Sequence, residues 1–419
     1  MIERRKPIPV TKAIEKLMNH LPAVKVESVR LQQAYGRILG ENIVANYDIP
    51  HFNRSAYDGF AICSNDTKGA SGESRIQFKV VDHIGAGDVS KVIVGKREAV
   101  RIMTGAAMPA GTDTVVMFEQ ARAEGEDTFS IRKPFILGEN ISFQGEDARK
   151  GELLLESGAV IHPGIIALLA TLGYGEVKVA KKPIVGIIAT GTELLDVDEA
   201  LQPGKIRNSN GYMIEAQLQR MGIEYRSYGM QSDDLDQCYD TVVKALSETD
   251  CLITTGGVSV GDFDFAPGVY KRLGAEVLFN KVLMRPGSVT TAAVFNDQYL
   301  FGLSGNPSAC FSGFELFVRP VLLKMMGCNK PYLQQVKAIL MEDFLKPNPF
   351  TRFIRATYEF TAGIPMVKPA GFNKSNAVTS IARGNAIIVL PNGTRGYRAG
   401  TEVDVLLLGT EEGVAEWNL

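Results

Sequence analysis

The sequence has only five cysteines and four histidines in 419 residues, and neither set has the spacing of a metal site. There is no CxxC pair and no HExxH motif, so neither a zinc knuckle nor a zinc protease is indicated. An odd number of scattered cysteines also argues against a disulfide framework. We therefore interpret all five as small buried hydrophobic residues: Cys63, Cys238, Cys251, Cys310 and Cys328.

Long apolar runs and net charge are also scarce. No run approaches the roughly 20 residues that a membrane span needs, and no apolar signal-peptide core follows the charged N-terminus. The formal charge is −2 and the pI about 6.2, which give no sign of bulk nucleic-acid or anionic-membrane binding. We expect a cytosolic protein of roughly three domains with neither nucleic acid nor membrane as a partner.

Two apolar runs stand out, and each ends in polar residues. Residues 184–189 lead into Thr190-Gly191-Thr192-Glu193, and residues 251–253 lead into the glycine-rich stretch 254–265. Helical patterns separate such runs, which is typical of buried parallel strands in a doubly wound sheet. Ligands of these sheets bind beyond the carboxyl ends of the strands. The sequence therefore predicts an anion site there, together with a metal.

Carboxylates follow the predicted strands, so we expect them to converge at one edge of the sheet. They are Glu193, Asp233, Asp234, Asp262 and Asp264. Mg²⁺ is commonly held by one or two carboxylates plus phosphate oxygens of the substrate. Helix capping or a solvated loop remains the alternative for each acid.

Three turns offer further binding groups. The glycine loop, residues 255–261, can cradle a phosphate with its backbone N–H groups, although it is neither a Walker A nor a GxGxxG motif. The turns at 285–288 and 304–308 add an arginine, serines and an asparagine. A plain turn, a surface arginine and helix caps stay open as alternatives.

The remaining patterns predict the domain organisation. Helices are expected from Thr11, again through residues 31–39, and from Pro163, whereas residues 47–146 show short apolar alternations and no long helix. Alternation also returns after Asn329. We predict a discontinuous helical domain (1–46 and 147–180), an inserted β domain (47–146), an α/β domain (181–328) and a C-terminal β-barrel-like domain (329–419).

Six segments together carry a resemblance that spans essentially the whole chain. They are residues 55–59, 103–105, 145–147, 189–193, 255–261 and 304–307. The sequence resembles the MoeA family, the molybdopterin molybdenumtransferases related to the E domain of gephyrin. The resemblance implies the multidomain α/β and β fold given above, assembled as a homodimer with an active site shared between subunits. It also implies a Mg²⁺-dependent reaction that cleaves adenylylated molybdopterin, releases AMP and transfers molybdate to the dithiolene.

The resemblance assigns roles to particular residues. The catalytic set is Asp58, Thr104, Asp147, Glu193, Asp233 and Asp264, and the metal ligands are Glu193, Asp233 and Asp264. The substrate-binding set is Thr255, Gly256, Gly257, Ser259, Gly261, Arg285, Ser288, Ser304, Gly305, Asn306 and Pro307. Many relatives have proline where this chain has Ser304, which leaves the stiffness of that turn open because serine does not fix φ.

Three alternative functions fit the sequence less well. A molybdopterin adenylyltransferase needs only the α/β domain and usually has a Thr-Gly-Gly-Thr-Gly loop, whereas Val258-Ser259-Val260 follows the double glycine here. A CinA-like protein lacks the inserted unit with residues 55–59. A gephyrin-like scaffold would use a fused second enzyme domain and a long linker, which this sequence lacks. As partners, the resemblance implies a molybdopterin adenylyltransferase and molybdoenzyme chaperones.

Overall fold

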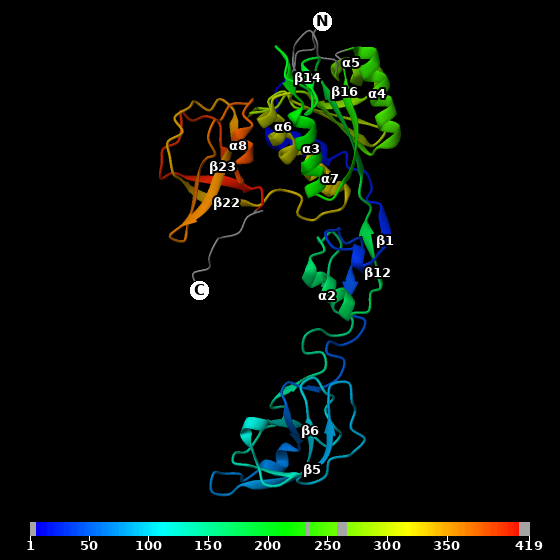
Figure 1. Cartoon of the computed structure of the whole chain (residues 1–419), viewed down its shortest axis with the longest axis vertical. Coiled ribbons are helices and arrows are strands. Elements are labelled where there is room, and N and C mark those ends of the chain that lie inside the picture. Colours follow the sequence, from blue (N-terminus) through cyan, green and yellow to red (C-terminus); the bar gives the residue numbers. More distant parts are fainter. Residues whose placement is uncertain (1–5, 232–233, 258–265, 410–419) are drawn as a thin grey trace. The chain divides into compact units, whose positions relative to one another are not determined.

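The computed structural model describes residues 6–231, 234–257 and 266–409. The chain divides into two compact units, which are described separately below. The larger unit contains residues 1–40, 158–162 and 176–419, and the smaller one contains residues 41–157 and 163–175. Figure 1 shows the elements of both units. No described helix is long and apolar enough to cross a membrane.

A six-stranded sheet forms the centre of the larger unit. Its strand order is β16-β13-β17-β21-β20-β18. The first four strands are parallel, as predicted, whereas β20 runs antiparallel to both of its neighbours, β21 and β18. The strands are β13 (Ile184–Thr190), β16 (Glu224–Gln231), β17 (Cys251–Thr255), β18 (Glu276–Phe279), β20 (Thr291–Phe295) and β21 (Gln298–Leu303).

Helices cover both faces of this sheet because each has one apolar side. Two of them, α4 (Leu235–Glu248) and α5 (Ala266–Leu273), pack on one face. The opposite face carries α3 (Ser209–Arg220), α6 (Pro307–Gly313), α7 (Arg319–Met325) and also α1 (Val10–Met18). A π-helical stretch, Phe314–Val318, joins α6 to α7, so the helical segment after Pro307 is continuous and widens locally.

A closed barrel follows the α/β domain, in agreement with the predicted C-terminal β domain. The strand pairs β22–β24, β24–β23, β23–β25, β25–β26 and β26–β22 complete a circle, so no edge is left open. Its elements are β22 (Gln335–Leu340), β23 (Thr351–Thr361), β24 (Ile364–Pro369), β25 (Ala386–Leu390), β26 (Glu402–Leu407) and the short α8 (Thr379–Ala382). A strand from the α/β domain, β19 (Met284–Arg285), pairs with β23.

The smaller unit is mainly β, as expected for the inserted segment. Its sheet has the order β7-β4-β6-β5-β9-β8. The strands are β4 (Gly59–Ile62), β5 (Ile76–Ile84), β6 (Glu98–Ile102), β7 (Thr114–Met117), β8 (Ala121–Ala123) and β9 (Thr128–Ile131). Short ladders pair β2 (Ile43–Val44) with β11 (Leu153–Leu155) and β3 (Arg54–Ser55) with β10 (Ile141–Ser142). The predicted helix at Pro163 is α2, Pro163–Thr171.

The prediction of a helix through residues 31–39 was wrong. Only a 3₁₀ turn, Leu31–Gln33, forms there, after strand β1 (Val26–Arg30), which pairs with β12 (Glu176–Ala180). Gly36 has a φ of +72°, which no right-handed helix accommodates. The apolar residues at 38 and 39 instead make bridges to Val160 and Val179. Long-range strand pairing therefore overrides a helix-like spacing of apolar residues.

Candidate active site

The carboxyl ends of β13, β17 and β21 meet at one edge of the sheet and are tied together there. The hydroxyl of Thr190 donates to the carbonyl oxygen of Thr255 at 3.2 Å, and the N–H of Gly256 donates to the Leu303 carbonyl at 3.1 Å. Gly256 has a φ of +89°, and a Cβ at this position would lie 2.3 Å from the Thr190 carbonyl oxygen. Only glycine fits such a close approach, so the double glycine shapes this edge.

A small cavity of about 50 Å³ opens at this edge, and Asn210 is its most constrained polar group. Its amide nitrogen donates to the Thr255 hydroxyl and to the Gly305 carbonyl, both at 2.9 Å. The side chain is buried, with 7% of the residue exposed, and its Oδ1 has no hydrogen-bond partner among the described residues. A buried amide oxygen without a donor is costly, which favours a ligand that donates to it.

Sequence reasoning missed Asn210 as a binding residue because an asparagine at the start of a helical pattern is typical of a cap. The cap of α3 is Asn208, whose side chain accepts from the N–H of Gly211 at 3.0 Å. The position of Asn210 in the helix could have distinguished it from the capping residue Asn208. It lies inside the first helical turn, where its side chain points across to the strand ends.

The predicted turn at Ser304 is held by its own hydroxyl. Ser304 is buried, its Oγ accepts from the N–H of Asn306 at 3.2 Å, and its carbonyl oxygen accepts from the Thr255 hydroxyl at 3.4 Å. This side-chain-to-backbone bond stabilises the turn without proline. Thr255, Gly305 and Pro307 all line the small cavity, and Asn306 lies between them in the chain.

The carboxylates at this edge are only partly within the described chain. Glu193 lines the small cavity and is exposed. Asp234 caps α4 by accepting from the N–H of Gln237 at 2.9 Å, so the capping alternative holds for this acid. The other expected acids, Asp233, Asp262 and Asp264, lie outside the described residues, as do Ser259 and Gly261 of the glycine loop.

A metal centre is not formed by the described residues alone. Among them, no three histidine, cysteine, aspartate or glutamate side chains gather where an ion could bind. Glu193 is the one expected ligand in the described part of the chain.

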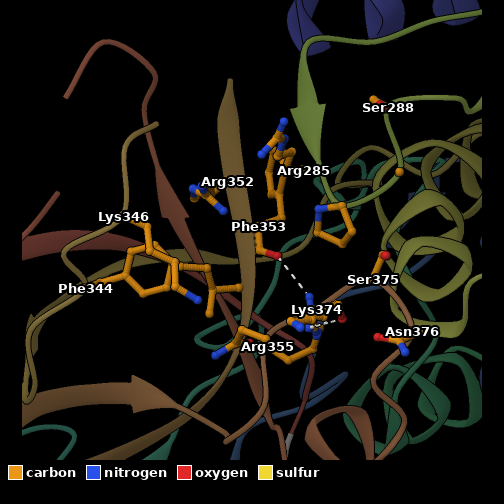
Figure 2. A pocket seen from close by; sticks show the side chains of 14 residues that line it. Arg285, Ser288, Phe344, Lys346, Arg352, Phe353, Arg355, Lys374, Ser375 and Asn376 are labelled. Atoms are coloured by element: carbon orange, nitrogen blue, oxygen red, sulfur yellow. Dashed lines mark hydrogen bonds between the residues drawn. The ribbon is translucent and has the colours of Figure 1, made fainter. Parts of the chain in front are cut away.

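A larger cavity of about 490 Å³, which we call the basic cavity, lies between the turn 285–288 and the barrel. Figure 2 shows its positively charged side chains around one hollow: Arg285, Lys346, Arg352, Arg355 and Lys374. The part of the lining that the structure describes contains no aspartate or glutamate. Arg285 and Ser288, which were predicted to bind substrate, both belong to it. A cavity of this size and charge suits a small anion or a phosphate group.

Arg355 is the most unusual cation of the basic cavity because it is buried and pairs with no carboxylate of the described residues. Only 2% of the residue is exposed. Its guanidinium donates to neutral oxygens at long distances, 3.4 Å to the Ser380 hydroxyl, 3.5 Å to the Phe353 carbonyl and 3.3 Å to the Lys374 carbonyl. Burial lowers its pKa to about 10. At neutral pH it is still charged, so an anion in the cavity would supply the missing counter-charge.

The basic cavity and the sheet edge share one structural connection. Pro307 lines the small cavity, and the next residue, Ser308, donates from its N–H to the Ser375 carbonyl at 3.0 Å and from its hydroxyl to the Ala377 carbonyl at 2.6 Å. Ser375 lines the basic cavity. The start of α6 therefore fixes the position of one cavity with respect to the other, within the larger unit.

The smaller unit brings two predicted residues together. Asp58 Oδ1 accepts from the Thr104 N–H at 2.7 Å and from the Thr104 hydroxyl at 2.8 Å. These bonds, the backbone one first, lower the pKa of Asp58 below its ordinary value. The next residue, Gly59, has to be glycine because a Cβ there would lie 2.1 Å from the Val116 carbonyl oxygen of the paired strand. The pair thus presents an ionised, exposed carboxylate in a fixed position.

The third predicted residue of this unit, Asp147, lies on a different segment. Its backbone N–H donates to the Ile49 carbonyl at 3.0 Å, and its side chain is exposed. Within the described residues it shares no hydrogen bond with Asp58 or Thr104.

Three family profiles match consecutive parts of the chain. The MoeA N-terminal region (domain I and II) matches residues 8–173, and a probable molybdopterin binding domain matches residues 186–324. The MoeA C-terminal region (domain IV) matches residues 337–408. Together they cover most of the sequence, including the sheet edge, the basic cavity and the Asp58–Thr104 pair.

Full-length relatives agree with these matches. The chain is 57% identical over 419 residues to the molybdopterin molybdenumtransferase of Staphylococcus aureus (strain COL), covering 100% of this chain and 99% of that protein. It is 56% identical over 406 residues to the Staphylococcus epidermidis (strain ATCC 12228 / FDA PCI 1200) protein of the same name, covering 97% of each. The crystal structure of the molybdopterin biosynthesis moeA protein from Pyrococcus horikoshii OT3 has a TM-score of 0.83 at 33% identity, covering 96% of this chain and 100% of that one.

Proposed function

This chain belongs to the MoeA family of molybdopterin molybdenumtransferases and is a transferase of molybdenum cofactor biosynthesis, and from this premise we propose its reaction in detail. It binds adenylylated molybdopterin and molybdate, cleaves the pyrophosphate link, releases AMP and leaves molybdenum on the dithiolene sulfurs. Cleaving a phosphoanhydride depends mainly on positioning the reacting groups and neutralising charge. The described residues are suited to both tasks.

The buried, carboxylate-free guanidinium of Arg355 in the basic cavity is the observation that carries the proposal. A charge buried in a protein interior is costly unless an opposite charge lies close to it. With Arg285, Lys346, Arg352 and Lys374 around the same hollow, the compensating species is a multiply charged anion. Molybdate and a substrate phosphate both meet this requirement. We assign the basic cavity, including Arg285 and Ser288, to the molybdate or phosphate side of the reaction.

The sheet edge is assigned to the pterin and its phosphate. Thr255, the double glycine and the turn at Ser304 offer hydroxyls, backbone N–H groups and space for close approach. Asn210 adds an open amide oxygen, which suits a donor such as a pterin N–H. Ser259 and Gly261 extend the same loop in the sequence.

Magnesium and dimerisation complete the proposal. Glu193, Asp233 and Asp264 would hold Mg²⁺, which would neutralise phosphate charge when bound. Asp58, Thr104 and Asp147 act on the α/β site of a partner copy in a homodimer. A cytosolic location and complexes with a molybdopterin adenylyltransferase and molybdoenzyme chaperones remain predictions. Chelation of divalent ions is expected to stop AMP release, and added Mg²⁺ is expected to restore it.

A charge-removing variant of the basic cavity tests the proposal. Arg285 is exposed and its only described partner is the ring of Phe350, 5.4 Å away, so Arg285→Gln should keep its fold. Loss of a charged hydrogen bond of about 1.5–3 kcal/mol should raise the molybdate concentration for half-maximal AMP release by roughly 10- to 150-fold. Arg398→Gln, an exposed barrel residue outside the cavity, is the matched control. Equal molybdate dependence in both variants would remove Arg285 from the site.

A further inference from the structure

A third cavity of the larger unit, of about 370 Å³, differs from both cavities described above and has no part in the proposed reaction. We call it the α3–α7 cavity because the end of α3 and one side of α7 line it. Its lining is basic and apolar at once. The basic residues are Arg37, Lys182, Arg220, Arg319 and Lys330, and the apolar ones include Met221, Leu323, Met326 and Leu408.

Positive charge exceeds negative charge around the α3–α7 cavity. Glu315, fully buried in the π-helical stretch, forms ion pairs with both Arg220 and Arg319, so one carboxylate serves two guanidinium groups. Arg37 pairs with Glu27. These two carboxylates face five cations, which leaves an excess of three positive charges.

The two lysines of this cavity are the unpaired cations. Within the described ranges, no carboxylate lies at ion-pair distance from Lys182 or Lys330. Burial and, to a lesser extent, the neighbouring Arg37 lower the pKa of Lys182. In the part of the chain that the structure describes, the buried Nε of Arg37 also lacks a hydrogen-bond acceptor. An anionic group entering the cavity would satisfy these three side chains.

The last described residues of the chain lead directly to this cavity. Leu408, which follows β26, lines it, and its carbonyl oxygen accepts from Arg220 Nη1 at 3.5 Å. Residues 410–419 come next in the sequence, Thr-Glu-Glu-Gly-Val-Ala-Glu-Trp-Asn-Leu. They contain three glutamates and no lysine or arginine, together with Val414, Trp417 and Leu419. Ten residues can span up to about 33 Å, more than enough to reach every wall of the cavity.

We propose that residues 410–419 bind in the α3–α7 cavity of their own chain. The three glutamates compensate the excess of three positive charges, and the apolar side chains cover Met221 and Leu323. Attachment two residues away gives the segment a local concentration on the order of millimolar, so modest contacts suffice. Binding there fastens the last barrel strand to α3 and α7. This proposal is independent of the proposed reaction.

Trp417 makes the test direct because it is the only tryptophan in the sequence. In the full-length protein, its fluorescence should be blue-shifted and poorly quenched by acrylamide, compared with a synthetic peptide of residues 408–419. In the double variant Lys182→Glu/Lys330→Glu, emission and quenching should move to those of the peptide. The matched control is Lys244→Glu/Lys368→Glu, which reverses two exposed lysines of the same unit outside the cavity and should behave as wild type.

Several results would overturn the proposal. One is a wild-type Trp417 that is quenched as readily as the peptide. Another is a shielded Trp417 that both double variants leave unchanged, which would place the segment elsewhere. If circular dichroism shows that the double variant has lost its fold, Lys330→Glu alone decides, because Lys330 is exposed. Restoration of wild-type shielding in that variant by inorganic phosphate would also contradict direct pairing with the glutamates.

Discussion

Two charged side chains, Arg355 and Asp58, show how neighbouring groups determine what a charge can bind. Arg355 is buried, yet the nearest acceptors are neutral and distant, so it is left to attract an anion. Asp58 is exposed, yet two donors from Thr104 hold its carboxylate in place. In both cases the immediate neighbours, more than depth of burial alone, decide what the group can do.

The Asp58–Thr104 pair has a defined pH behaviour. Because the pKa of Asp58 is lowered in the folded protein, its contribution to stability is present above the ordinary value of 3.8 and is lost as pH falls through the lowered pKa. Thr104→Val removes the hydroxyl donor but keeps the backbone donor. We expect the pKa to rise while staying below 3.8, measured by NMR titration of the carboxyl carbon, with Thr112→Val as the unshifted control. A pKa that does not change would show that the hydroxyl bond is not made in solution.

The same pair is predicted to be needed for turnover. Asp58→Asn keeps the size of the side chain but removes the charge, and the exposed position lets the fold tolerate the change. AMP release should therefore fall strongly, while the melting temperature should stay close to that of the wild type, as is usual for a surface substitution. Full activity of this variant would count against a catalytic role for Asp58.

At the scale of secondary structure, Asn210 links three elements through one side chain. It joins α3 to the end of β17 and to the turn before α6. Asn210→Ala leaves the Thr255 hydroxyl with weaker partners and the Gly305 carbonyl unpaired. We expect a loss of about 1–3 kcal/mol in unfolding free energy, measured by urea denaturation.

A second substitution on α3 serves as the comparison for Asn210→Ala. Gln219 is exposed and donates to the Tyr225 hydroxyl at 2.8 Å, so Gln219→Ala also removes one side-chain bond. The surface position limits its effect to about 0.5 kcal/mol. Equal losses in the two variants would show that Asn210 does not hold the strand ends together.

The central strands and the helices around them were predictable, whereas the cavities were not. Apolar runs such as residues 184–189 give an unambiguous local signal because every side chain in them is buried or nearly so. Arg285 and Arg355 lie 70 residues apart and meet only because β19 pairs with β23 of the closed barrel. The predicted helix through residues 31–39 failed for a similar reason. The chain turns at Gly36, and the neighbouring strand β1 pairs with β12, which is distant in the sequence, so the local spacing of apolar residues did not indicate the pairing.

For the whole molecule, the predicted carboxylates are divided between two units. Glu193 belongs to the larger unit and Asp58 to the smaller one. If the active site is shared between subunits, an Asp58→Asn protein mixed with a Glu193→Gln protein should regain part of the AMP-release activity after subunit exchange. Random exchange leaves one intact site in each mixed dimer. Absence of recovery, with mixed dimers confirmed by differently tagged subunits, would place the whole site within one chain.

The most direct test of the proposed function follows the reaction itself. Purified protein is incubated with adenylylated molybdopterin and Mg²⁺, with and without molybdate, and two quantities are measured: AMP released and activation of a molybdenum-free apoenzyme by the product. The proposal predicts AMP release that depends on molybdate, accompanied by an active apoenzyme. Binding of adenylylated molybdopterin without release of AMP, or release without activation, would contradict it.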